Sequence, residues 1–121
     1  MSRHDPTIRL LHMRDFARKA VAMAKDRTRE DLEGDEMLEL ALTRLVELIG
    51  EAANQVRREV QDKYPEIPWE DIVGMRHHLV HGYEYVDRNI LWDAITNNLP
   101  ALVEELEKIV PEQQGPQAKQ E

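Results

Sequence analysis

The chain has 121 residues, a length that fits one domain built around a single hydrophobic core. Charged residues make up 33% of the chain and aromatic residues only 5%, a balance typical of a helical bundle with an aliphatic core. The net charge of −8 argues against a general nucleic-acid-binding protein. The absence of cysteine excludes disulfides, thiol chemistry and zinc–thiolate sites.

The pattern of apolar residues predicts an all-α fold, a four- to five-helix up-and-down bundle that forms one domain over residues 1–110. The polar, Gln-rich segment 111–121 is predicted to be a disordered tail. No apolar run is long enough to span a membrane, and the N-terminus lacks the apolar core of a signal peptide. We therefore expect a cytoplasmic protein with no membrane partner.

The first long helix is predicted from about Pro6 to Lys25, because Asp5 is a suitable N-cap and proline is favoured at the first helical position. Thr28 and Asp31 indicate a short second helix or a turn, and a glycine-containing break follows at 33–35. The first helix therefore connects to the next one through a short irregular segment.

The next long helix is predicted from about Glu36 to Asp62. Gly50 lies inside it, where glycine costs about 0.5–1 kcal/mol relative to alanine, and we interpret it as the point of a close helix crossing. The apolar stripe that would face the core consists of Leu38, Leu42, Leu45, Ile49, Ala52, Ala53, Val56 and Val60.

The segment 63–68 is predicted to be an extended connector, because each residue before a proline is pushed away from helical geometry. A third helix should begin at Pro68 and end near His81 and Gly82, with Trp69 as a packing anchor.

Asp87 is a suitable N-cap for a fourth helix. The sequence Asn-Asn-Leu-Pro at 97–100 should kink or restart this helix, because proline has no amide hydrogen to donate. Beyond that point the apolar stripe continues to Val110.

Residues 74–86 read G-M-R-H-H-L-V-H-G-Y-E-Y-V and contain the pattern R-x-x-x-x-H-x-Y, formed by Arg76, His81 and Tyr83. Arginine offers a planar set of donors suited to phosphate oxygens, and histidine can take or give a proton near neutral pH. Such a pair can cleave RNA without a metal, since the RNA supplies its own 2′-hydroxyl nucleophile and the arginine stabilises charge on the phosphate. Five residues of helix separate the two side chains by about 140°, so one straight helix would not place them on one face.

The neighbouring histidines offer a metal site as an alternative. His77 and His81 have i, i+4 spacing, and His78 and His81 have i, i+3 spacing, so either pair would share one helix face. A metal site needs three or four ligands, however, and His4 and His12 lie on a different predicted element. We therefore predict no metal ligand and no cofactor.

This motif resembles the HEPN superfamily, and within it the HepT-like toxins of bacterial and archaeal toxin–antitoxin pairs. Three further segments are similar to the same family in the same order, namely I-G-E-A-A at 49–53, Y-P-E-I-P-W at 64–69, and L-W-D…N-N-L-P-A-L from 91 to 102. The resemblance spans about Asp5 to Val110.

The resemblance implies a HEPN-like helical bundle and a metal-independent endoribonuclease, in which Arg76 and His81 are catalytic and two chains pair so that both motifs meet in one cleft. His77 would help to position the phosphate. Glu51, which matches the acidic residue of the family's I-G-E-A segment, either orients a catalytic side chain or is a solvated surface residue. The family also implies a partner, a small nucleotidyltransferase antitoxin of a type VII-like system that transfers AMP to Tyr83.

Other functions fit the same residues. The acidic net charge favours a non-catalytic helical subunit that binds a nucleotide or a nucleotidyltransferase. A His–metal enzyme is another alternative, and it would lose activity with a chelator. A purely structural helical dimer is the simplest interpretation.

The charge around Arg76 distinguishes an RNA-cleaving enzyme from a binding subunit. A basic cleft would need Arg57, Arg58, Lys63, Arg76 and Arg88 to meet. Carboxylates that would repel RNA phosphate are Glu51, Glu84 and Asp87.

Overall fold

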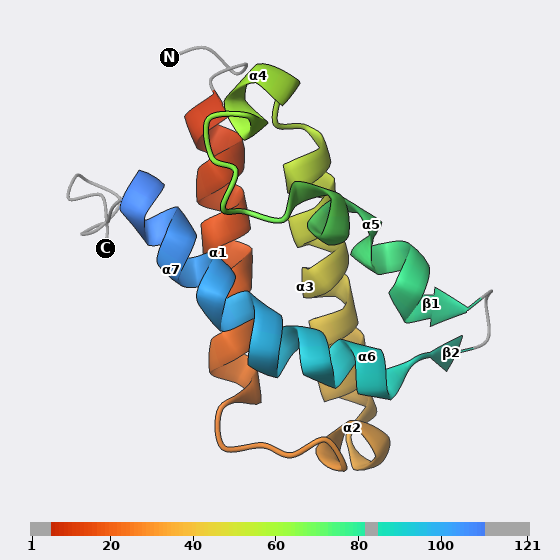
Figure 1. Cartoon of the computed structure of the whole chain (residues 1–121). Coiled ribbons are helices and arrows are strands. Elements are labelled where there is room, and N and C mark those ends of the chain that lie inside the picture. The colour runs from red at the N-terminus through yellow and green to blue at the C-terminus, as the bar shows by residue number, and fades with distance from the viewer. Residues whose placement is uncertain (1–5, 82–84, 111–121) are drawn as a thin grey trace.

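The computed structural model describes residues 6–81 and 85–110, so the predicted N-cap Asp5 and the predicted tail 111–121 lie outside the described residues. Figure 1 shows a helical bundle with one small hairpin. The elements are α1 Pro6–Ala24, α2 Asp31–Gly34, α3 Glu36–Asn54, α4 Arg58–Gln61, α5 Trp69–Leu79, β1 Val80–His81, β2 Tyr85–Val86, α6 Arg88–Asp93, the π-helical turn η1 Ala94–Asn98, and α7 Leu99–Ile109.

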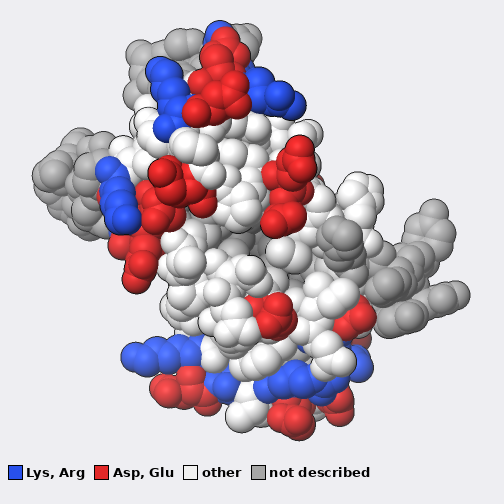
Figure 2. All heavy atoms as spheres, viewed as in Figure 1, with Lys and Arg blue, Asp and Glu red and all other residues white. Residues whose placement is uncertain are grey.

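Helix α1 packs against both α3 and α7, and α5 packs on α3. Successive long helices run in opposite directions along the bundle (Figure 1), which confirms the predicted all-α up-and-down architecture. On the face seen in Figure 2, Lys and Arg side chains lie toward the edges of the bundle, whereas the charged side chains around the middle are Asp and Glu. The largest fully buried side chains are Met13, Leu32, Leu42, Ile67, Leu79, Leu91, Ile95 and Leu106. No described helix is long and apolar enough to cross a bilayer.

The long helices begin at the residues that the sequence indicated. Asp35 caps α3 by accepting a hydrogen bond from the backbone amide of Leu38 at 3.1 Å, and Asp87 caps α6 in the same way with Ile90 at 3.1 Å. The hydrogen bond from Leu38, followed by that from the Arg27 guanidinium, lowers the pKa of the Asp35 carboxyl below its ordinary value. These caps confirm the expected helix starts.

The helix predicted from Glu36 to Asp62 is wrong beyond Asn54, where α3 ends. The Gln61 side chain donates to the carbonyl of Ala53, in the last turn of α3, at 3.2 Å and to that of Val56, just beyond α3, at 3.1 Å. Arg57 then takes extended geometry, with φ −64° and ψ 149°, before the short helix α4. A single side-chain contact of this kind leaves no periodic signal in the sequence.

The connector 63–68 is irregular, as expected, and leads into α5. Trp69 is buried, and its indole nitrogen donates to the carbonyl of Tyr64 at 3.0 Å, so the predicted role as a packing anchor is confirmed. The predicted restart near residues 97–100 is also confirmed. It takes the form of the π-helical turn η1, after which Pro100 stands in the first turn of α7.

Gly50 marks a close approach of α3 and α5. A Cβ atom built at this position would lie 3.1 Å from the backbone carbonyl oxygen of Ile72 and 3.7 Å from that of Val73. The predicted helix crossing is therefore present, and a larger residue would push the two helices apart. Gly74, on α5, has open space around the equivalent position: apart from its chain neighbours and the backbone of its own helix, no atom of the described residues lies within 4 Å.

Replacing Gly50 and Gly74 by alanine should change the free energy of unfolding in opposite directions. Gly74→Ala should raise the free energy of unfolding by about 0.5–1 kcal/mol, since alanine is the better helix former and has room there. Gly50→Ala should lower it by about 1 kcal/mol or more, because its Cβ meets a backbone atom that cannot move independently. Thermal and urea unfolding of the two variants would measure this difference. Equal stabilisation by both changes would contradict the close crossing.

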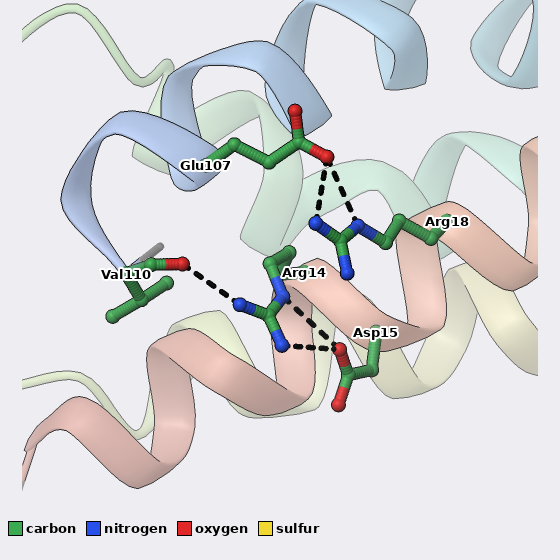
Figure 3. A network of polar contacts seen from close by, with 5 residues as sticks. All are labelled: Arg14, Asp15, Arg18, Glu107 and Val110. Carbon is green, nitrogen blue, oxygen red and sulfur yellow. Dashed lines mark hydrogen bonds and ion pairs between the residues drawn. The ribbon is translucent and has the colours of Figure 1, made fainter. Parts of the chain in front are cut away.

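Arg14 is the one charged residue buried among those that the structure describes, with 5% of its surface exposed. Its Nη1 donates to the carbonyl of Val110 at 2.8 Å, at the C-terminal end of α7, and its Nε and Nη2 both contact Asp15 Oδ1 (Figure 3). A guanidinium at this position donates to a carbonyl at the helix end, and its positive charge interacts favourably with the negative end of the helix dipole. Arg14 therefore joins α1 to the C-terminal end of α7.

Arg14→Met should destabilise the protein by about 1–3 kcal/mol, because it leaves the buried carbonyl of Val110 without its donor. Arg18→Met is the matched control. Arg18 also joins α1 to α7, through Glu107 at 2.8 Å, but this pair is solvent-exposed and should be worth less than about 1 kcal/mol. Chemical denaturation of both variants gives the comparison, and an equal cost would show that burial of Arg14 carries no special stabilisation.

Candidate active site

Helix α5 ends at Leu79, two residues before the predicted end at His81. The chain continues as β1, which pairs antiparallel with β2, so that Val80 lies opposite Val86 and His81 lies opposite Tyr85. The prediction that the helix reaches His81 is therefore wrong. β-branched Val80 and Val86 and aromatic Tyr85 favour a strand, and a two-stranded ladder replaces the last helical turn.

Because the helix ends at Leu79, helical spacing does not relate His81 to the residues of α5. The angle of about 140° between Arg76 and His81 applies only to a continuous helix. The i, i+3 and i, i+4 pairs of His78 and His77 with His81 also need such a helix. Within the part of the chain that the structure describes, no three His, Asp or Glu side chains form a metal-ligand group.

The hairpin is held to the bundle at its base. The Asp87 amide donates to the Leu79 carbonyl at 2.8 Å, so the end of β2 returns to the end of α5. The next residue, Arg88, forms an ion pair with Glu39 of α3, with Nε and Oε2 2.9 Å apart. Glu39 has only 13% of its side chain exposed, so this pair lies partly in the core. No local sequence pattern links Glu39 to this hairpin, because 49 residues separate it from Arg88.

The predicted site residues come from three elements. Arg76 and His77 lie in α5, His81 lies in β1, and Glu51 lies in α3, which packs on α5. His77 is exposed. Tyr83 lies outside the described residues, between β1 and β2. The side chains of Arg76 and His81 also lie outside the described part, so the backbone alone places these positions.

Glu51 is a half-exposed carboxylate that faces a cation of its own helix. Its side chain is 56% exposed, and Oε2 lies 3.6 Å from Nη1 of Arg44. Arg44 also donates to Glu47, one turn earlier, at 3.3 Å. Glu47 is the more buried of the two acids, with 20% of its side chain exposed. The acidic face of α3 thus contains Glu47 as well as the predicted Glu51.

The arginines proposed for a basic cleft do not all gather in one place. Arg57 and Arg58 follow the C-terminal end of α3, whereas Arg88 is bound to Glu39 near its N-terminal end. The helix between Glu39 and Asn54 is roughly 22 Å long at 1.5 Å per residue. The fold therefore divides these cations between the two ends of α3.

Three hollows border α5 among the described residues. One at the start of the helix, with a volume of about 400 Å³, has Arg58, Asp62, Glu70 and Asp71 as its charged lining residues. The other two lie on different sides of α5 and differ in charge. One, with a volume of about 290 Å³, has an apolar floor of Val46, Ile49, Ile72 and Leu102, and its charged lining residues are Glu66, Asp71 and Glu105. Figure 2 shows Asp and Glu side chains, and no Lys or Arg, around the middle of this face among the described residues. An apolar hollow ringed by carboxylates disfavours a phosphate.

The second hollow is a groove of about 570 Å³ between the end of α3, α4 and the start of α5. Its charged lining residues are Arg57, Arg58 and Glu70, so it carries one more positive than negative charge. We refer to it below as the arginine groove. Its lining residues are Asn54, Gln55, Val56, Arg57, Arg58, Gln61, Trp69, Glu70, Val73 and Gly74.

Comparison with known proteins identifies similar chains. The sequence model of the family described as "Ribonuclease HepT-like" matches residues 13–109. A protein of Thermococcus cleftensis named "Probable ribonuclease HepT" is 32% identical over 102 residues, which cover 81% of this chain and 92% of that protein. A Methanocaldococcus jannaschii protein named "Putative RNase MJ1380" is 29% identical over 107 residues, covering 88% and 98% respectively. No solved structure matches this chain significantly.

Glu39→Gln should loosen the hairpin. The change removes the charge that binds Arg88 and should cost about 0.5–1 kcal/mol, since Arg88 is 40% exposed. Amide hydrogen exchange should become faster at residues 80–88, with little change in α1 and α7. Glu36→Gln, on an exposed position one turn earlier, is the control. Unchanged exchange in the hairpin would show that the backbone contacts alone hold it.

Proposed function

The chain belongs to the ribonuclease HepT-like family, and we propose that it is a metal-independent endoribonuclease and the toxin of a type VII-like toxin–antitoxin pair. The observation that carries this proposal is the R-x-x-x-x-H-x-Y motif of Arg76, His81 and Tyr83 inside the matched region. Its position supports the proposal, because the motif spans the junction where α5 gives way to the hairpin.

The reaction follows from the two side-chain types. The 2′-hydroxyl oxygen of the RNA attacks the adjacent phosphorus, the bond to the 5′-oxygen breaks, and a 2′,3′-cyclic phosphate and a 5′-hydroxyl are left. His81 transfers the proton, at the attacking 2′-oxygen or at the leaving 5′-oxygen. Arg76 stabilises the negative charge on the non-bridging oxygens. His77 would support the phosphate, and Glu51 would orient a catalytic side chain. No metal or cofactor takes part.

A homodimer would combine two such motifs in one cleft. The exposed apolar residues Met37 and Leu40 support a docking surface, since they are 81% and 60% exposed on adjacent turns of α3. Leu40 follows Glu39, which binds Arg88 at the base of the hairpin. A second copy packed against this end of α3 would therefore approach the hairpin.

The cognate antitoxin would be a small nucleotidyltransferase that modifies Tyr83. The phenolic oxygen attacks the α-phosphorus of ATP, pyrophosphate leaves, and AMP remains on the tyrosine. The added phosphate places negative charge beside Arg76 and His81, where the RNA phosphate would otherwise bind. Modification therefore blocks the substrate through charge and volume.

The net charge of −8 and the separation of Arg57 and Arg58 from Arg88 favour a second candidate function. In that case the protein would be a non-catalytic subunit that binds the nucleotidyltransferase or its nucleotide. A protein of this kind would bind its partner without cleaving RNA.

Ribonuclease assays on the purified protein test the proposal. With EDTA present, the unmodified wild type should cleave single-stranded RNA and leave 2′,3′-cyclic phosphate ends. His81→Ala should reduce the rate by about 10²–10⁴-fold, and Arg76→Ala by about 10²–10³-fold. Loss of cleavage in EDTA would indicate a metal enzyme instead, and a wild type that leaves RNA intact would favour the binding subunit.

Two controls separate the parts of this proposal. Mixing the inactive Arg76→Ala and His81→Ala proteins should restore part of the activity only if each site takes its arginine and histidine from different chains. Co-expression with the nucleotidyltransferase should increase the intact mass by one or more AMP units and abolish cleavage. Tyr83→Phe should remain unmodified.

A further inference from the structure

The arginine groove continues along α5 toward the motif. Three of its lining residues on α5 are Glu70, Val73 and Gly74, whose spacing of three and four residues places them on one side of the helix. His77 is the next position of this series, three residues beyond Gly74, and it is exposed. The groove therefore runs along the helix face that leads to His77, about one turn away.

The groove has the donors that a nucleic-acid backbone needs. Arg57 and Arg58 supply guanidinium groups, and the exposed side chains of Asn54 and Gln55 supply amides. Arg57 pairs with Glu59 at 2.9 Å, but both side chains are more than 60% exposed. Such an exposed pair is worth less than about 1 kcal/mol, so a phosphate can replace the carboxylate at little cost.

Gly74 leaves this part of the groove lining without a side chain. A glycine inside a helix costs about 0.5–1 kcal/mol, and no atom of the described residues lies within 4 Å of the position that its Cβ would take. Packing among the residues that the structure describes thus gives no reason for a glycine at this place, unlike Gly50. An open position on the groove floor allows another backbone to approach α5 closely.

We propose that the arginine groove binds the single strand of RNA that flanks the cleaved phosphate, with Arg57 and Arg58 on its phosphates and Gly74 beneath it. This inference rests on the proposed function and adds a substrate-binding surface to it. The apolar hollow on the other side of α5 is lined by Glu66, Asp71 and Glu105 and repels a phosphate backbone. The strand therefore leaves the site along the arginine groove.

Binding to the inactive protein tests this surface independently of cleavage. In the His81→Ala background, fluorescence anisotropy with a labelled single-stranded RNA of roughly 16 nucleotides measures affinity in EDTA between about 50 and 200 mM KCl. Replacing both Arg57 and Arg58 by Gln removes two phosphate contacts. The slope of log K against log salt should then fall in magnitude by about 1.4, and affinity near 0.1 M salt should fall about 25-fold.

The matched control removes two positive charges elsewhere. Lys25 and Lys108 are exposed and lie outside the groove, and their double replacement by Gln should leave the salt slope nearly unchanged. A second pair of variants tests the floor. Gly74→Glu and Gly74→Gln have nearly equal size, and the glutamate should weaken RNA binding more strongly because it faces phosphate. Thermal unfolding checks that each variant is folded.

The outcomes separate the two proposals. If the wild type cleaves RNA but the arginine double variant keeps the original slope and affinity, the groove proposal is wrong and the ribonuclease proposal stands. If the wild type does not cleave RNA but binding depends on Arg57 and Arg58, the groove is an RNA site in a non-catalytic protein. If the His81→Ala protein does not bind the RNA at all, the groove proposal is overturned, and wild-type cleavage alone then decides the ribonuclease proposal.

Discussion

The close approach of α3 and α5 at Gly50 determines where the motif lies. Because Gly50 has no side chain, the carbonyl oxygens of Ile72 and Val73 lie against α3, and the path of α5 is fixed over its first two turns. The position of α5 in turn determines where the features next to it lie. The arginine groove opens on one side of the crossing and the apolar hollow on the other, and the hairpin extends from the end of α5.

The hairpin gives the motif a geometry that a continuous helix would not. With α5 ending at Leu79, Arg76 belongs to a helix and His81 to a strand, so their relative position depends on the hairpin as well as on helical spacing. The return of the chain at Asp87 and the ion pair of Arg88 with Glu39 hold this arrangement to α3. The hairpin is thus bound to the same helix that positions α5.

Charge is distributed so that an acidic protein keeps a local basic surface. The chain carries a net charge of −8, and the apolar hollow is ringed by carboxylates. Arg57 and Arg58 lie at a break in the helical structure that the Gln61 side chain stabilises, and Arg58 also lines a hollow with Asp62 and Asp71. Under the proposed function, an RNA strand is repelled by most of the surface and directed to the groove beside α5.

The sequence alone determined the fold class, the start of α3 at Glu36, the helix cap Asp87, the connector with Trp69, and the family to which the motif belongs. These features depend on neighbouring residues, so local spacing and backbone sterics were sufficient to predict them. The end of α3 at Asn54 and the end of α5 at Leu79 were predicted wrongly. Both depend on contacts that helical periodicity does not reveal: the Gln61 side chain with the carbonyls of Ala53 and Val56, and β1 with β2. Likewise, only the folded chain separated Arg88 from Arg57 and Arg58, because a sequence gives the number of charges but not the distances between them.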